Sequence, residues 1–379
     1  MRNHINIEVM KMIKCGTGLL GFITYICMKC LEELKVGLTC KSRFCNKCGQ
    51  KYIKEWVEKQ VNRIIGVPHR HCVFTVPEEY RKFFYDNRKY LKDLQDMVHE
   101  VIEEYANGVN KNNRKEYEKK KRKKKADLLW KVGLIGVVHT FGRNIRFNPH
   151  VHALVAEIKV KGKEIEKMNY FNYSYFRRSW QWKLINFMIE KNPKRKKEYL
   201  KYFKEYKNGF YVRAKTGMKS AKACAKYIGR YLGKPAIAEY RIIKYDKNRV
   251  TFWYIDHRTG KKMIEDIDVE EFVGRVLMHI PPKNFKMARR YGIYSGSLAK
   301  KVRQHVGLIK YIKSGLKEFQ YTLKNYWNKK DIKISWREMM IDSFSKDPQI
   351  CKNCGSEMEV WEIRHSKYGK VFYLPDLAS

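Results

Sequence analysis

Short apolar runs and longer amphipathic stretches follow one another along the chain, separated by turn-forming residues. Residues 71–76 are apolar and end at a proline, so they predict a buried strand, and the helical spacing over residues 78–105 predicts a helix after it. Residues 133–140 are apolar and β-branched, and residues 148–155 have the same character after a turn at residues 142–146. These two runs predict a β-hairpin.

The second half of the chain continues this mixture of elements. Residues 173–206 are rich in Lys and Tyr at helical spacing, and residues 220–233 predict another helix that ends at a glycine and a proline. Two more strands are expected at residues 240–245 and 249–256. This order of elements predicts an α+β fold, in which helices cover an antiparallel sheet.

Composition divides the chain into three regions. Residues 16–56 hold five cysteines among short segments with too little apolar material for a core, so we expect a small zinc-binding module over residues 1–62. The predicted hairpin and its helices form the main domain, residues 63–262. Residues 263–379 form a basic C-terminal region, in which residues 301–346 are helical in pattern but carry no motif.

The charge of the chain is strongly positive. Its 81 Lys and Arg residues exceed 39 Asp and Glu residues, which gives a formal net charge of +42. Such an excess favours a polyanionic partner through phosphate neutralisation, and nucleic acid is the expected one. The longest uncharged stretch, residues 15–28, is too short to span a membrane, and no signal peptide precedes it, so no membrane partner is expected. A phosphate-binding G-x-x-x-x-G-K-[ST] loop is absent from the sequence, so no nucleotide is expected either.

Most of the ten cysteines occur in Cys-x-x-Cys pairs, the spacing of zinc ligands in reducing cells, which favours a cytoplasmic protein over a disulfide scaffold. Four thiolates complete a tetrahedral Zn²⁺ site, and two Cys-x-x-Cys turns are its usual geometry. We therefore expect Cys27, Cys30, Cys45 and Cys48 to be the ligands, with Cys40 as an alternative.

The other cysteines offer weaker patterns. Cys351-x-x-Cys354 resembles one half of a zinc ribbon, but only His365 lies downstream to complete a site. The remaining three are expected to be buried or incidental thiols: Cys15, Cys72 and Cys224.

A pair of histidines lies in the second strand of the predicted hairpin. His150 and His152 share one face of the strand because alternate residues do, while Val151 points into the packed layer. Folding the chain back through the turn brings His139 roughly opposite them. Three imidazoles in this arrangement predict a site for one divalent cation.

A second histidine pair with the same spacing is less favourable. Between His69 and His71 lies Arg70, which would have to point into the apolar layer beneath the sheet. His71 remains a weaker option as a third metal ligand or as a DNA contact.

Two tyrosines supply candidate nucleophiles. Tyr227 and Tyr231 lie four residues apart on a predicted helix and therefore occupy one face of it, flanked by Lys226 and Arg230. Beside a histidine metal site on a basic protein, they suggest phosphodiester transfer, in which a tyrosine attacks phosphorus and a metal stabilises the transferring group. We expect Lys226, Arg230 and, in the zinc module, Arg43 to contact DNA.

The strand Asn148–Val155 combined with Tyr227-x-x-x-Tyr231 resembles the two-tyrosine HUH transposases, specifically the bacterial insertion sequence 91 group, which is related to Helitrons. Three further segments resemble landmarks of that family in the same order: residues 74–77, 138–142 and 285–292. The resemblance runs from about Cys27 to Ser297, roughly three-quarters of the chain.

This resemblance implies a ferredoxin-like antiparallel sheet with Mg²⁺ or Mn²⁺ at the HUH histidines, where His139 is similar to the third histidine of relaxases. It implies a transposase that nicks single-stranded DNA at element ends and target, forming 5′-phosphotyrosine intermediates in rolling-circle-like transposition. It also implies that the zinc module recognises element ends and that the protein acts at the bacterial nucleoid.

Two other functions fit parts of the pattern. A plasmid replication initiator or relaxase of the HUH class would keep the same histidines and nick DNA for a different element. A non-catalytic, zinc-dependent nucleic-acid-binding protein would need only the charge and the cysteines, and it gives no reason for His150, His152, Tyr227 and Tyr231 to coincide.

Overall fold

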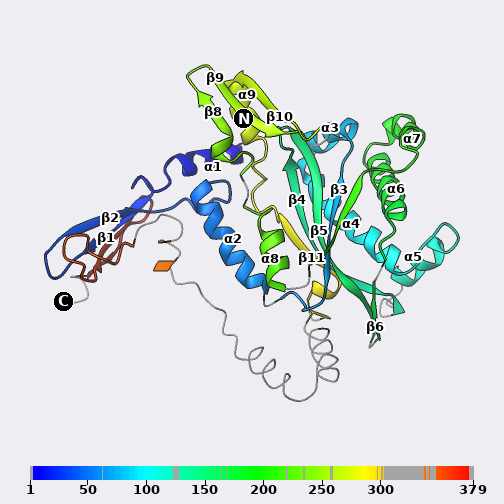
Figure 1. Ribbon diagram of the computed structural model, residues 1–379, viewed down its shortest axis with the longest axis horizontal. Helices are drawn as coiled ribbons and strands as arrows, with labels where there is room; N and C mark the ends of the chain where they lie inside the picture. Colours follow the sequence, from blue (N-terminus) through cyan, green and yellow to red (C-terminus); the bar gives the residue numbers. More distant parts are fainter. Residues whose placement is uncertain are drawn as a thin grey trace, which may run out of the picture.

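The protein is described from a computed structural model (Figure 1). The structure describes the following residues: 3–61, 63–122, 128–162, 164–168, 170–218, 221–233, 235–256, 259–296, 298–299, 302, 337–338, 341 and 347–374. The motif-free segment 301–346 therefore lies almost wholly outside the described residues.

A six-stranded antiparallel sheet forms the centre of the molecule, in the order β11-β4-β5-β3-β7 with β6 paired to β5. The strands are β3 (His69–Thr75), β4 (Lys131–Phe141), β5 (Phe147–Lys161), β6 (Glu164–Lys167), β7 (Val212–Met218) and β11 (Ala288–Tyr291). β4 and β5 are the predicted hairpin, and β3 is the predicted buried strand, so these three predictions are confirmed.

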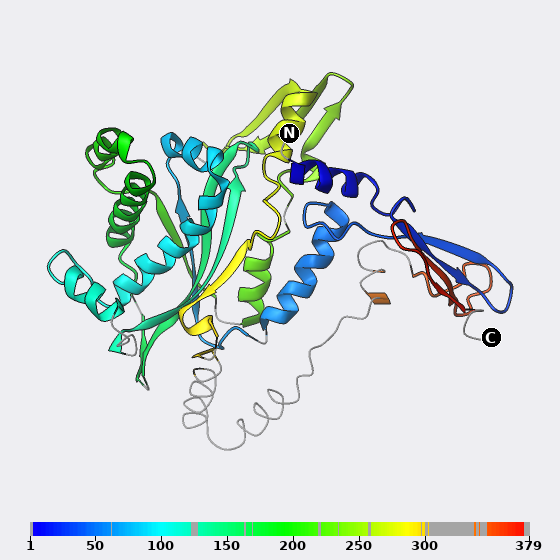
Figure 2. The ribbon, with the colours of Figure 1, turned by 180° about the vertical axis from the view of Figure 1, so that it is seen from behind.

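Helices cover both faces of this sheet, as Figures 1 and 2 show from opposite sides. One face packs on a layer of four helices: α3 (Glu78–Asp86), α4 (Leu91–Ala106), α6 (Tyr173–Lys191) and α7 (Lys196–Glu205). The other face packs on α2 (Asn46–Val61) and α8 (Ala221–Gly229). A short basic helix, α5 (Arg114–Arg122), follows α4. The α+β prediction is confirmed.

Strand β5 contributes side chains to both apolar layers, because successive side chains of a strand point to opposite faces. Val151 and Val155 are fully buried in the cluster under α4 and α6, whereas Leu154 and Ala156 are buried in the cluster under α8. The same alternation sends the predicted histidine pair to the α8 side. A helix that lies on this face therefore meets the histidines.

Two smaller sheets extend the molecule. β8 (Ile242–Tyr245), β9 (Arg249–Ile255) and β10 (Lys262–Asp268) form one of them and lead into α9 (Val269–Leu277). The other has the order β13-β12-β1-β2 and follows α1 (Asn3–Ile13). Its members are β1 (Gly21–Ile26), β2 (Glu33–Gly37), β12 (Glu359–His365) and β13 (Gly369–Tyr373).

Strand β1 near the N-terminus thus lies beside β12 near the C-terminus, blue against red-brown in Figure 1. Residues 263–379 were expected as one C-terminal region, but their described strands are distributed over all three sheets. Among the described helices, none has the length and apolar character that crossing a membrane requires.

Two glycines let α8 lie close to α2. A Cβ atom at Gly229 would come within 2.5 Å of the Val57 Cγ2 atom, and one at Gly233 within 2.7 Å of the Gly49 carbonyl oxygen. Real Cβ contacts are not that short, so a side chain at either position would push the helices apart. The two glycines therefore allow the end of α8 and the turn after it to lie directly against α2.

We predict that Gly229→Ala destabilises the protein by about 1–3 kcal/mol, because the new methyl group overlaps a β-branched side chain. Gly274→Ala is the matched control, since Gly274 is also helical and its Cβ would meet nothing within 4 Å. That control should gain roughly 0.5–1 kcal/mol from helix propensity. Denaturant unfolding measures both, and equal effects of the two substitutions would contradict the close packing.

Candidate active site and cysteine clusters

Three histidines converge on the face of the sheet that α8 covers. His139 on β4 is the direct partner of His150 on β5, and His152 lies two residues further along the same strand. One nitrogen from each ring lies within 4.8 Å of the others. His139 and His152 are buried, with 3% and 7% of their surface exposed, while His150 is half-buried. The structure therefore brings together all three histidines that the sequence singled out.

In the His150 and His139 rings, a hydrogen bond to a carbonyl oxygen determines which nitrogen carries the lone pair. The His150 Nδ1 donates to the Asn148 carbonyl oxygen at 2.7 Å, so its Nε2 keeps the lone pair. The His139 Nε2 donates to the Tyr231 carbonyl oxygen, so its lone pair is on Nδ1. The Nε2 atoms of His150 and His152 are 3.0 Å apart. Adjacent ligands about 2.1 Å from an octahedral cation would be separated by about 3 Å, so the rings fit one divalent ion.

His71 on β3 also reaches this site. Its Nε2 lies 3.0 Å from the His152 Nδ1, and its Nδ1 lies 3.2 Å from the Tyr227 hydroxyl oxygen. His71 therefore bridges a histidine of the cluster and a tyrosine instead of joining the three-histidine set.

Arg70, which was expected to make the His69 and His71 pair unfavourable, does lie at the apolar layer, but it has partners there. The Arg70 Nε pairs with the Glu157 carboxylate at 2.9 Å, and its guanidinium lies 4.2 Å from the centre of the Phe171 ring. These contacts offset the cost of placing Arg70 at the apolar layer, so that cost was the wrong reason for disfavouring the histidine pair, although neither His69 nor His71 belongs to the three-histidine set. His69 instead bonds Tyr294 and the Val67 carbonyl oxygen, and burial lowers its pKa to about 4, which keeps it neutral.

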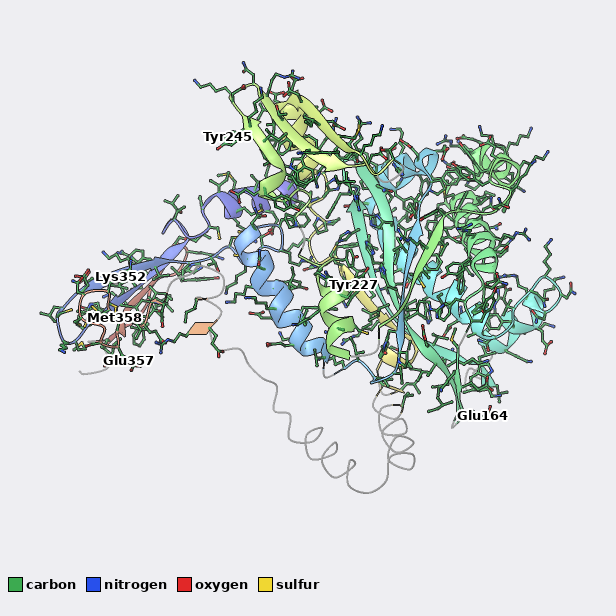
Figure 3. The ribbon with its side chains drawn as sticks, in the orientation of Figure 1. Glu164, Tyr227, Tyr245, Lys352, Glu357 and Met358 are labelled. Carbon is green, nitrogen blue, oxygen red and sulfur yellow. The ribbon has the colours of Figure 1, made fainter. Side chains whose placement is uncertain are left out.

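The two tyrosines approach the histidines from α8. Helix α8 ends at Gly229, four residues before the predicted end, so Tyr227 lies in its last turn and Tyr231 in the turn that follows. That turn is tight, with the Tyr231 N–H donating to the Ile228 carbonyl oxygen at 3.1 Å. Figure 3 places Tyr227 on α8 beside the central sheet.

Each tyrosine has a distinct environment. The Tyr231 ring stacks on the His152 ring with centroids 3.8 Å apart, and its hydroxyl donates to the Tyr227 oxygen at 3.2 Å. Burial, together with this hydrogen bond, raises the pKa of Tyr231 above its ordinary value. The Tyr227 oxygen receives that bond and also faces His71. A proton shared from Tyr231 would stabilise negative charge on Tyr227.

Exposed basic side chains border the site. Lys226 and Arg230 are exposed, and the Arg230 guanidinium lies 4.9 Å from the centre of the Tyr227 ring. Arg213 on β7 was missed in the sequence, because its position follows only from register: Val73 pairs with Arg213 on one side and with His152 on the other. The three residues therefore share one face of the sheet, and Arg213 is exposed there.

Arg43, expected to contact DNA, is half-buried and makes an internal contact. Its Nη2 donates to the Phe285 carbonyl oxygen at 3.3 Å, and its guanidinium lies 5.6 Å from the centre of the Tyr52 ring. The bond to Phe285 joins the cysteine-rich N-terminal segment to the residues that lead into β11 of the central sheet.

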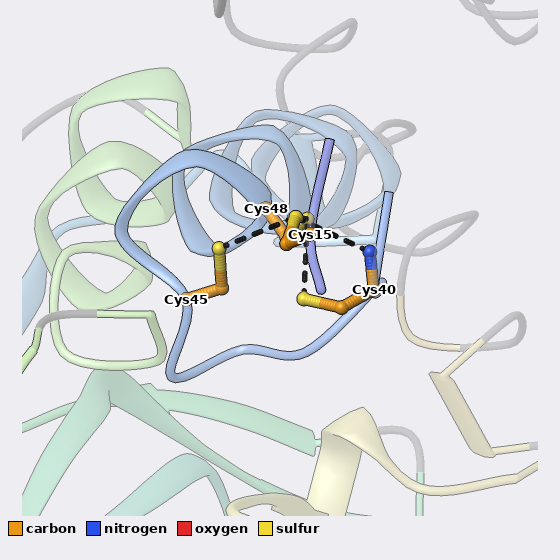
Figure 4. Close-up of side chains that lie close together, drawn as sticks. All are labelled: Cys15, Cys40, Cys45 and Cys48. Atoms are coloured by element: carbon orange, nitrogen blue, oxygen red, sulfur yellow. Dashed lines mark hydrogen bonds between the residues drawn. The ribbon is translucent and has the colours of Figure 1, made fainter. Parts of the chain in front are cut away.

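A cluster of four cysteines lies at the start of α2 (Figure 4), made of Cys15, Cys40, Cys45 and Cys48. The Cys48 sulfur is 3.6 Å from the Cys15 sulfur and 3.7 Å from the Cys40 sulfur. Sulfurs bound tetrahedrally at about 2.3 Å from Zn²⁺ are about 3.8 Å apart, so this cluster fits zinc.

The predicted ligand set for zinc is wrong in its grouping. Cys45 and Cys48 join Cys15 and the alternative ligand Cys40, whereas Cys27 and Cys30 join the second cluster with Cys351 and Cys354. Cys15 was expected to have no role, yet its sulfur lies 3.7 Å from the Cys45 sulfur. Cys-x-x-Cys spacing identifies the pairs, but only the tertiary fold decides which pairs meet.

Two family models match parts of the chain that hold these residues. The family model described as Transposase zinc-binding domain matches residues 1–76, which include the cluster at α2, and the model described as Putative transposase matches residues 133–302, which include the histidines and tyrosines. No solved structure matches the chain significantly.

Two curated relatives match most of the chain. The transposase for insertion sequence element IS801 from Pseudomonas savastanoi pv. phaseolicola is 28% identical over 300 residues, 75% of this chain and 68% of the relative. The Putative transposase y4qJ from Sinorhizobium fredii (strain NBRC 101917 / NGR234) is 21% identical over 304 residues, 73% of this chain and 71% of the relative.

Proposed function

Because the chain belongs to the insertion sequence 91-like transposases, DNA-cleaving enzymes with an N-terminal zinc-binding domain, we propose that it nicks single-stranded DNA and transfers strands through 5′-phosphotyrosine intermediates in rolling-circle-like transposition. One observation carries the proposal. The hydroxyl of Tyr227 lies within hydrogen-bond reach of His71, which itself contacts a member of the three-histidine cluster. Nucleophile and metal-ligating groups are thus held together.

Tyr227 is the first nucleophile in this proposal. Its oxygen forms a bond to the phosphorus of the scissile phosphodiester, and the bond to the 3′ oxygen breaks. The 3′ oxygen leaves with a proton as a 3′-OH, and the 5′ phosphate stays on the tyrosine. Tyr231 is less suited to attack first, because burial and its hydrogen bond to Tyr227 raise its pKa.

Tyr231 supplies the second cleavage. While one tyrosine holds the donor end, the other cleaves the target or the second end, and each free 3′-OH then attacks the opposite phosphotyrosine. That attack restores a phosphodiester and returns the phenol, so no external energy source is required. The 3.2 Å separation of the two hydroxyl oxygens supports a shared site for both strands.

The three-histidine cluster is the proposed site for Mg²⁺ or Mn²⁺, and a bound ion would stabilise charge on the transferring phosphoryl group. Among the described residues, no carboxylate belongs to this cluster. Imidazole nitrogens suit transition metals better than Mg²⁺, which prefers oxygen ligands. The donor set therefore favours Mn²⁺ over Mg²⁺.

Arg213, Lys226 and Arg230 are the proposed contacts for the DNA backbone. All three side chains are exposed: Arg230 lies over the Tyr227 ring, Lys226 directly precedes Tyr227, and Arg213 shares the sheet face of His152. Phosphate contacts of this kind position a strand without reading its sequence, and they weaken as salt rises. The net charge of +42 supports the same partner.

The alternatives fit less of the molecule. A replication initiator or relaxase would share the histidine chemistry, but the matched family models and curated relatives are those of transposases. A binding protein without catalysis would need neither the tyrosine pair nor the histidine cluster. Clustered thiols suit a reducing compartment, which supports the proposal that the protein acts in the cytoplasm.

With single-stranded element-end DNA and Mn²⁺, we predict a covalent protein–DNA adduct that denaturing gels resolve. Tyr227→Phe should abolish this adduct because the first nucleophile is lost. Tyr231→Phe should keep the first adduct but lose strand transfer to a second DNA.

Tyr211→Phe is the matched control, because Tyr211 is exposed and precedes β7 instead of lying on α8. It should behave as the wild type does. A wild type without adduct, or an adduct that survives both substitutions at Tyr227 and Tyr231, would overturn the catalytic proposal. Loss of the first adduct in Tyr231→Phe alone would reverse the order of the tyrosines.

We also predict that His150→Ala separates cleavage from binding. It removes a metal ligand, so cleavage should fall by more than the roughly 10–100-fold typical of an outer-shell change. Single-strand affinity, which depends on phosphate contacts, should stay within about threefold. His365→Ala, a change on the distant β12, is the control for both assays. Equal loss of affinity and cleavage in His150→Ala would indicate a structural histidine.

A further inference from the structure

We propose that the two ends of the chain form one zinc ribbon around a second tetrahedral Zn²⁺ site, with Cys27, Cys30, Cys351 and Cys354 as thiolate ligands. This site does not depend on the proposed nuclease chemistry. The matched zinc-binding domain ends at residue 76, so half of the ligands lie outside it.

Distances between the sulfurs fit a shared metal ion. Cys27 lies 3.5 Å from Cys354, Cys30 lies 3.5 Å from Cys351, and Cys30 also lies 3.5 Å from Cys354. Tetrahedral ligands about 2.3 Å from Zn²⁺ would be about 3.8 Å apart, whereas disulfide sulfurs are bonded at about 2.05 Å. All four sulfurs lie within 4.8 Å of one another, and none of these separations is a disulfide bond length.

The two Cys-x-x-Cys turns have the same hydrogen bonds. In the first, the Leu31 N–H donates to the Cys27 carbonyl oxygen at 2.8 Å, and in the second the Gly355 N–H donates to the Cys351 carbonyl oxygen at 3.0 Å. Both Leu31 and Gly355, directly after the second cysteine of each pair, have positive φ angles of 61° and 69°.

A second bond also repeats. The Cys27 N–H donates to the Glu32 carbonyl oxygen, and the Cys351 N–H donates to the Ser356 carbonyl oxygen, both at 2.9 Å. Two turns some 320 residues apart thus present equivalent halves of one ligand cage. Left-handed backbone is costly for Leu31, and a fixed ligand geometry gives a reason to keep it.

The surrounding core is too small to hold these strands without a metal. β1 pairs with β12, and among the described residues the apolar cluster here has five partly buried members around four buried ones: Tyr25, Cys27, Cys351 and Met358. Figure 3 places Met358 and Lys352 beside β1 and β2. Small units of this kind are normally stapled by a metal or disulfides. The zinc ion would therefore fasten the β12–β13 hairpin to the N-terminal hairpin.

Counting zinc in purified full-length variants tests this pairing. With His150→Ala present throughout, so that the histidine cluster does not add to the zinc count, the parent chain should bind two zinc ions, one at each cysteine cluster. Replacing Cys27 and Cys30 by Ser should leave one ion, and replacing Cys351 and Cys354 by Ser should also leave one. All four replacements together should still leave one, because both pairs hold the same ion. Cys72→Ala, a buried cysteine outside both clusters, should keep two.

Two zinc ions in the Cys351 and Cys354 double variant would overturn the proposal, as would none in the quadruple variant. Hydrogen exchange of the wild type supplies a test that needs no variant. Gradual zinc chelation should expose the amides of residues 21–26 and 359–365 in the same step. Loss of protection at residues 21–26 alone would also contradict a shared site.

Discussion

The antiparallel pairing of β5 with β4 on one side and β3 on the other is the constraint on which the site depends. It sets His139 opposite His150 and Val73 opposite His152, and β3 carries His71 to the same face. Because side chains alternate, a shift of one residue in β5 would bury its histidines under α4 and α6 and turn its valines toward α8. Burial of apolar side chains on both faces of β5 therefore fixes the strand register, and this register places the imidazole rings together.

A second constraint positions the tyrosines on that face. α8 lies against α2 through Gly229 and Gly233, and α2 begins at the cysteine cluster of Cys45 and Cys48. A metal ion bound there would contribute folding free energy directly, because such a site does not exist in the unfolded chain. The N-terminal cysteine-rich segment thus supports α8, the helix that carries Tyr227, through α2. Arg43 fits this supporting role, since it bonds the Phe285 carbonyl oxygen inside the protein.

Local patterns predicted most of the fold, and long-range contacts account for what they missed. The hairpin with His139, His150 and His152 follows from alternation and one turn, which the sequence contains. The cysteine grouping was not predictable in that way, because Cys351 meets Cys30 only through the pairing of β1 with β12. His71 was undervalued because Glu157, the partner that stabilises Arg70, is distant in sequence. Helix α8 ends early at Gly229, where the close approach of Val57 on α2 leaves no room for a Cβ atom.

The most direct measurement is peptide mapping of the wild-type protein–DNA adduct by mass spectrometry. Trypsin cleaves after Lys226 and Arg230, so Tyr227 and Tyr231 fall on different peptides. After brief reaction with an end-labelled single strand, the DNA remnant should lie on the Tyr227 peptide through a 5′ phosphate, and the released fragment should end in a 3′-OH. A remnant on a peptide that contains neither tyrosine, or a linkage through a 3′ phosphate, would contradict the account.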